Sequence, residues 1–156
     1  DAWAEQSDYI NTLNIDNSPT DLFLGNLFSI YDSYALIGMG NNNGIEFLQL
    51  KTGYASYPVW VVTQSITAIH GNLPSNSCVA FGSALAIYNE YAIIGDPFFD
   101  SKKGAIFIYK RNSSDVWELY MTKLGQTVNG YFGNSVSING EHAIVGSDGK
   151  TDIVKL

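Results

Sequence analysis

The chain repeats itself three times, and this repetition restricts its fold more than any other feature of the sequence. The same glycine occurs early in each copy, separated by 57 residues and then by 51: Gly25, Gly82 and Gly133. The tryptophans keep an equal interval of 57 residues: Trp3, Trp60 and Trp117. Two independent markers with matching intervals make chance a poor explanation, so the sequence predicts an array of similar structural units.

Each unit has the composition and the alternation of β-strands. Valine, isoleucine, tyrosine and phenylalanine dominate, and apolar residues alternate with polar ones or run in short blocks. Asn139-Gly140 is the strongest hairpin signal, because a type I′ turn needs positive φ at both central residues. We expect four antiparallel strands per unit, with third strands at 45–50, 105–110 and 151–156 and tryptophan-bearing fourth strands at 2–8, 58–66 and 116–122. Four strands at this period are typical of a β-propeller blade.

The motif around the repeated glycine points to one kind of blade. Phe81-Gly82 and Phe132-Gly133 precede an apolar strand, and the strand after it ends in Gly95 or Gly146. This pattern resembles the FG-GAP family of propeller blades, which occurs in integrin α-subunit heads. The first copy departs from the pattern, since Leu24 replaces the phenylalanine. The resemblance implies an all-β fold of three four-stranded blades and a non-catalytic, extracellular role.

The phase of the repeat predicts how the blades are completed. We expect one domain over residues 1–156, with units at about 22–66, 79–122 and 130–156. Residues 2–8 match a fourth strand, whereas the last unit stops after its third strand, so we predict that 2–8 completes the last blade. Propellers have about four to eight blades. Three arrangements therefore stay open: a piece of a larger parent propeller, a ring of two copies, or a head-to-tail filament.

Composition and charge argue against several classes of protein. Only 15% of residues are charged, against about 25% in ordinary domains. The net charge of −7 lacks the basic footprint that nucleic-acid binding needs. No run of about 20 apolar residues is present, so no membrane insertion is expected. The chain begins at Asp1 rather than Met, which indicates either a removed leader or a piece of a longer protein.

Cysteine and histidine provide little chemistry. The single cysteine, Cys78, allows no disulfide within the chain, and we expect it to pack as a small apolar side chain rather than act as a reactive thiol. His70 and His142 lack the ligand spacing of a zinc site, and we place His142 at a sheet edge. The turns after the first strands lack the closely spaced oxygen ligands that calcium needs. We therefore expect no metal, no cofactor and no enzymatic activity.

The loop at 96–100 has two interpretations. Asp96 and Asp100 have the spacing of a possible acid and base pair, but a turn beginning Asp-Pro explains the same residues. We favour the turn, in which Phe98 and Phe99 would form an exposed apolar contact. Asn112-Ser113-Ser114 is the only N-glycosylation sequon, and it lies in a polar turn where a glycan can be attached if the protein is secreted.

The repeated tryptophans also have two interpretations. Packing between neighbouring blades is favoured, because large aromatic side chains dominate protein cores. Stacking on sugar rings is the alternative and would make the protein a carbohydrate-binding module. The sequence therefore predicts a secreted or cell-surface structural or adhesive module that contacts other copies of itself or a larger parent propeller. Glycan binding is one alternative, and a non-catalytic segment of a larger surface hydrolase is another.

Overall fold

The computed structural model describes residues 24–39, 44–52, 58–67 and 80–156, and these residues form an all-β structure of three antiparallel sheets. The first sheet has the order β1 (Leu24–Tyr31), β2 (Tyr34–Met39), β3 (Gly44–Lys51) and β4 (Val59–Thr67). The second has β5 (Ala84–Tyr88), β6 (Tyr91–Asp96), β7 (Ala105–Arg111) and β8 (Trp117–Leu124). The third has only β9 (Ser135–Asn139), β10 (His142–Ser147) and β11 (Lys150–Lys155).

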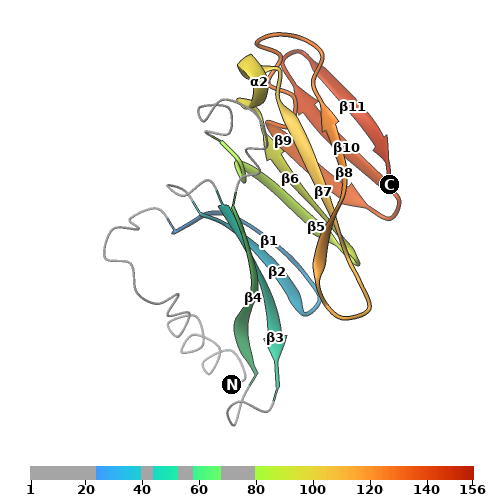
Figure 1. The fold of residues 1–156 in the computed structure, drawn as a ribbon. Coiled ribbons are helices and arrows are strands. Elements are labelled where there is room, and N and C mark those ends of the chain that lie inside the picture. The colour runs from blue at the N-terminus through green and yellow to red at the C-terminus, as the bar shows by residue number, and fades with distance from the viewer. Residues whose placement is uncertain (1–23, 40–43, 53–57, 68–79) are drawn as a thin grey trace, which may run out of the picture.

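Each repeat of the sequence thus forms one sheet, and the all-β prediction is confirmed. The second sheet lies between the first and the third, as Figure 1 shows. The first strands of neighbouring sheets are in contact, β1 with β5 and β5 with β9. The strand expected at 2–8, together with Trp3, His70 and Cys78, lies outside the described residues.

Near the turn, the first two strands of each sheet pair in the same register in all three repeats, whereas the first sheet alone has a register shift between Leu24 and Phe28. The two-residue turns lie between Tyr31 and Tyr34, between Tyr88 and Tyr91, and between Asn139 and His142. In the third repeat the central turn residues are therefore Gly140 and Glu141, one position later than Asn139-Gly140. Only Gly140 has positive φ, so the expectation of a type I′ turn is wrong. The hairpin itself is confirmed.

Two apolar clusters hold the three sheets together. The first lies between the first and second sheets and contains buried side chains from both, such as Leu36 and Phe47 opposite Ile94 and Tyr109. Burial raises the pKa of Tyr109 to about 12. The second cluster joins the second and third sheets, with Ile93, Ile106 and Ile108 on one side and Ala143, Val145 and Val154 on the other. Because side chains alternate between the two faces along each strand, the second sheet directs one face to the first sheet and the other to the third.

A repeated glycine contact fixes how closely the sheets approach. A Cβ atom on Gly38, at the end of β2, would lie 2.9 Å from the carbonyl oxygen of Gly82 in the next sheet. A Cβ atom on Gly95 would come even closer to the carbonyl oxygen of Gly133. Gly82 and Gly133 have φ of 88° and 89°, which favours glycine. The motif glycines are therefore needed on both sides of this contact.

The loop between β6 and β7 is a turn, as favoured from its sequence, but it has an unexpected backbone. The short segment α2 (Phe99–Lys102) has three consecutive residues with positive φ, Asp100, Ser101 and Lys102, so it is a left-handed turn rather than an ordinary helix. Phe98 is 42% exposed, whereas Phe99 is buried and its ring contacts Phe107 with 5.9 Å between centroids. The expected exposed contact of both rings is therefore wrong, since Phe99 belongs to the core.

Gly95→Ala should destabilise the fold because the added methyl group meets a backbone carbonyl that cannot move aside. We expect the free energy of unfolding to fall by about 1–3 kcal/mol or more, measured by urea unfolding at low protein concentration. Gly146→Ala is the matched control. The nearest atoms to its methyl group would be the side-chain atoms Ser135 Oγ and Asn134 Oδ1, which can rotate, with Ser135 Cβ next at ordinary van der Waals distance. Equal losses in the two variants would contradict the glycine contact.

Candidate functional site

Trp117 lies at the contact between the first and second sheets. It is 2% exposed and stacks on Phe47 of β3, with 4.7 Å between ring centroids and 19° between planes. Its backbone N–H donates to Gln64 Oε1 at 2.9 Å, and Gln64 Nε2 donates to its carbonyl oxygen at 2.8 Å. The side chain of Gln64 thus acts like a neighbouring strand for β8. Trp117 packs between sheets and has no free ring face for a sugar.

A polar cluster lies at the edge of the same contact between the first and second sheets. The guanidinium carbon of Arg111 lies 3.9 Å from the centroid of the Tyr34 ring, and Arg111 Nη1 donates to the Tyr34 hydroxyl and to Asp115 Oδ1. Gln49 Nε2 also donates to the Tyr34 hydroxyl, at 3.0 Å. Hydrogen bonds from Tyr34 and Arg111 lower the pKa of Asp115, and burial raises the pKa of Tyr34. This cluster joins two sheets, and within it Gln49 Oε1 and Arg111 Nε are buried without a hydrogen-bond partner among the described residues.

The third sheet differs from the other two at its last strand. β11 pairs with β10 and has no second partner among the described residues. Its equivalents β3 and β7 each lie between two strands. The outer N–H and C=O groups of β11 are therefore placed to pair with a further strand. Apart from Val154, every residue of β11 is exposed.

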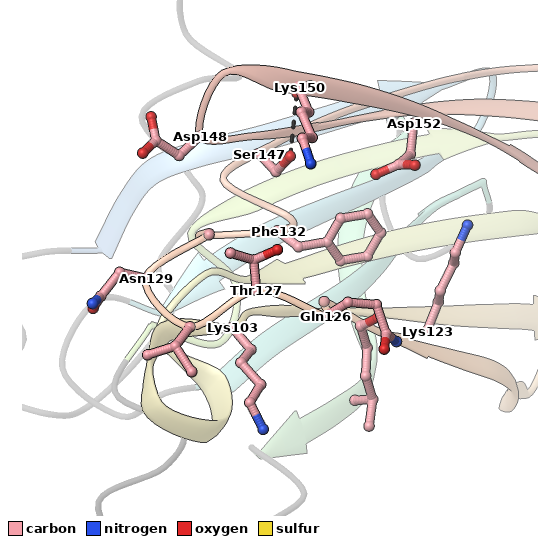
Figure 2. Close-up of a pocket in the computed structure, with 14 residues that line it drawn as sticks. Lys103, Lys123, Gln126, Thr127, Asn129, Phe132, Ser147, Asp148, Lys150 and Asp152 are labelled. Atoms are coloured by element: carbon pink, nitrogen blue, oxygen red, sulfur yellow. Dashed lines mark hydrogen bonds between the residues drawn. The ribbon is translucent and has the colours of Figure 1, made fainter.

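A hollow of about 480 Å³ borders this edge (Figure 2). Lys150 and Asp152 of β11 line one side, and Lys123 of β8 lies on another. The loop after β8 contributes Gln126 and Thr127. Amino, carboxylate, amide and hydroxyl groups thus share one open cavity. No group of three or more His, Cys, Asp or Glu side chains suited to a metal ion occurs in the described part of the chain.

The motif phenylalanines and glycines lie where neighbouring sheets meet. Phe81 and Phe132 are 3% and 4% exposed. The Phe81 ring packs edge-on against Phe107 of its own unit at 5.3 Å between centroids and belongs to the apolar cluster between the first and second sheets. The backbone of Phe132 forms a bridge with Gly104 of the second unit. Both phenylalanines therefore serve in packing within and between units.

The remaining predicted positions are spread over the molecule. Gly25 is the second residue of β1, and Trp60 lies half-buried on β4, opposite Leu50. Asn112 is half-buried in the turn between β7 and β8. Its Oδ1 accepts hydrogen bonds from the N–H groups of Ser114 and Val116, and its Nδ2 donates to Glu118 Oε1. The side chain of Asn112 organises the turn, and glycosylation there stays a prediction.

The structure separates the two carboxylates of the 96–100 loop. Asp96 is fully buried, and its Oδ1 accepts the N–H of Phe98 at 3.2 Å, which is the hydrogen bond of an Asx turn. Asp100 is half-buried and forms an ion pair of 2.9 Å with Lys103. His142 begins β10, the middle strand of the third sheet, so its expected place at a sheet edge is wrong. β10 pairs with β9 on one side and with β11 on the other, as the second of successive antiparallel strands does.

Some residues of these contacts were missed from the sequence. Gln64 and Arg111 lie at positions of the repeat that the other units do not share, so periodicity gives no signal for them. The hollow forms from the loop after β8 and the turn after β10, which differ in each unit. The chain matches no family model and no curated protein. Among the described residues, no helix is long and apolar enough to cross a membrane.

Gln64→Met tests how much Gln64 contributes to the contact at Trp117. Methionine occupies the equivalent position in the second sheet, at Met121, and keeps the side-chain volume. We expect the free energy of unfolding to fall by about 1–3 kcal/mol, because two backbone groups of Trp117 lose their partners. Gln126→Met in the exposed loop is the control and should change little. No difference between the variants would mean that water replaces Gln64 at no cost.

Proposed function

We propose that the protein is a non-catalytic structural or adhesive module outside the cell that works by contact with other protein chains, including copies of itself. The observation that carries this proposal is the third sheet, which has three strands where its two neighbours have four. Within the part of the chain that the structure describes, β11 pairs with β10 alone, so its outer backbone groups have no partner there along the full strand. Such an edge is a template for a strand from another chain.

The segment 2–8 is our candidate for the added strand. Trp3 precedes Trp60 by the same 57 residues that separate Trp60 from Trp117. Trp60 and Trp117 lie opposite Leu50 and Arg111 of their third strands. The equivalent position of the third sheet is Leu156, so we propose that Trp3 of a neighbouring chain lies opposite Leu156. In this arrangement each added strand links one propeller-type, FG-GAP-like unit to the next.

Deleting residues 1–10 should reduce the mass of the assembled protein, because it removes the added strand. We would measure mass by light scattering and assembly shape by negative-stain imaging of the 156-residue chain and the shortened chain. A peptide of residues 1–10 should bind to the shortened chain and cap β11, and a scrambled peptide should not. Unchanged assembly after the deletion, together with no peptide binding, would contradict the proposal.

Carbohydrate binding is the second candidate, and the hollow beside β11 is the observation that favours it. Its carboxylate, amide and hydroxyl groups suit the hydroxyl groups of a sugar, and Asp152, Gln126 and Thr127 provide them. Trp117 is excluded from such a role by its burial. The half-buried Trp60 stays available as a second aromatic candidate.

A glycan array with the labelled chain separates this candidate from the first. Under the protein-contact proposal we expect no specific glycan signal. Specific binding that Asp152→Ala or Trp60→Ala removes would favour the carbohydrate-binding function instead. Glu141→Ala, an equal loss of charge in the turn between β9 and β10, is the control and should leave any such signal unchanged.

A further inference from the structure

Neighbouring sheets contact each other through the same cross-strand pair in each repeat. In the first sheet, Leu36 of β2 lies opposite Phe47 of β3, and both side chains are fully buried against the second sheet. In the second sheet, the equivalent pair is Ile93 and Ile108, again fully buried, now against the third sheet. This pair therefore marks the face of each sheet that receives the next one.

The third sheet presents the same pair to solvent. Ile144 of β10 lies opposite Ile153 of β11, and these side chains are 51% and 70% exposed. Gly146 is the equivalent of Gly38 and Gly95, whose Cα atoms lie against a glycine carbonyl of the next sheet. We call this surface, with Ile144, Gly146 and Ile153, the back face of the third sheet. It has the features of a receiving face.

The acceptor of one polar contact between the first and second sheets has an equivalent on the back face of the third sheet, although Ala86 stands at this position in the second sheet. Ser29 of β1 lies on the side of the first sheet that faces the second, and its Oγ accepts the N–H of Ile87 of β5 at 3.1 Å. Ser137 of β9 occupies the equivalent position on the back face of the third sheet, and it is exposed. It offers a hydroxyl acceptor at the place where a further sheet would bring an N–H group.

The first sheet presents the matching surface. Leu85 and Ile87 of β5 pack against the first sheet, and their equivalents in β1 are Phe28 and Ile30. Phe28 is 74% exposed and Ile30 is 59% exposed. We call this surface the front face of the first sheet. A single chain thus exposes both halves of a contact that it buries twice internally.

We propose that the front face of one copy docks on the back face of the third sheet of a second copy, repeating the internal contact between sheets. This inference rests on the proposed function and names its partner as a second copy of this chain. Phe28 and Ile30 of one copy would cover Ile144 and Ile153 of the other. Ser137 would accept the N–H of Ile30, and Gly146 would receive the backbone at Gly25, the equivalent of Gly82 and Gly133.

The partner is identified by continuity with contacts already present in the chain. From Phe28 to Tyr31 the first two strands pair in the same register as their equivalents in the second and third sheets, so this part of the first sheet of a second copy brings the same backbone spacing. Between Leu24 and Phe28 the first sheet differs from the other two by a register shift. The two faces differ from each other, so the contact is heterologous. Both a ring of two copies and a longer head-to-tail chain contain it.

Two charge variants and their mixture test the proposal. Phe28→Lys disrupts the front face and leaves the back face intact, whereas Ile153→Lys does the reverse. Both side chains are mostly exposed, so we expect each variant to fold, with an unchanged circular dichroism spectrum. By light scattering, each variant alone should have the mass of one chain. An equimolar mixture should form pairs with twice that mass, because one intact face of each kind remains.

Val128→Lys is the matched control, since Val128 is 56% exposed and lies on neither face. It should assemble like the unaltered chain. Gly146→Ala should lower the mass of the assembly while leaving the stability of the single chain nearly unchanged. The proposal is overturned if the unaltered chain stays monomeric at all concentrations, if Ile153→Lys assembles normally, or if the mixture stays monomeric.

These outcomes separate this inference from the strand proposal on which it rests. If deletion of residues 1–10 abolishes assembly while both lysine variants still assemble, strand exchange stands and face docking fails. If the lysine variants abolish assembly while the deletion has no effect and the peptide of residues 1–10 does not bind, docking stands without the added strand. A monomeric chain whose shortened form still binds the peptide would indicate that the back face belongs against a further sheet of a longer polypeptide.

Discussion

The close approach of two glycine backbones is the constraint on which the arrangement of the sheets depends. Gly38 meets the carbonyl of Gly82, and Gly95 meets that of Gly133, so the backbones of neighbouring sheets approach with no side chain between them. This contact places β1 beside β5 and β5 beside β9. The cross-strand pairs Leu36–Phe47 of the first sheet and Ile93–Ile108 of the second then contact the next sheet in a fixed register. A larger residue at Gly38 or Gly82 would separate the first and second sheets and open the first cluster, and one at Gly95 or Gly133 would do the same to the second cluster.

The features that the sequence predicts well are those that repeat. Equivalent positions in three copies define strands, turns and the motif glycines, because each copy independently supports the same alternation. Features found in a single copy were missed or misplaced. Phe99 is buried because the left-handed turn at Asp100 directs the chain back over the core. No local pattern in residues 96–100 predicts this left-handed backbone conformation. The side chain of Gln64 forms two hydrogen bonds with the backbone of Trp117 on β8, as a neighbouring strand would, and this contact is visible only in the packed structure.

The candidate site was predictable only in outline. The phase of the repeat predicts that residues 2–8 supply the fourth strand of the last unit, and the third sheet has three strands among the described residues. The exposure of Phe28 and Ile153 could not be read from the sequence, since both look like ordinary core residues of a strand. Their equivalents Leu85 and Ile108 are indeed packed between sheets. Exposure depends on which sheet comes next, and that is a property of the array rather than of the residue.

The strength of the proposed contact follows from the decrease in apolar side chains along the array. The first internal contact uses aromatic rings such as Phe47 and Trp117. The second is mainly aliphatic apart from Phe132, and the back face offers Ile144 and Ile153 among polar neighbours. Burying a large apolar side chain contributes about 1.5–3 kcal/mol, whereas association costs about 4–15 kcal/mol. The free energy gained by burying Ile144, Ile153 and their two partners, Phe28 and Ile30, is thus similar to the cost of association and does not clearly exceed it. Pairing of an added strand with β11 would supply the remainder, so strand exchange and face docking should act together and make assembly depend on concentration.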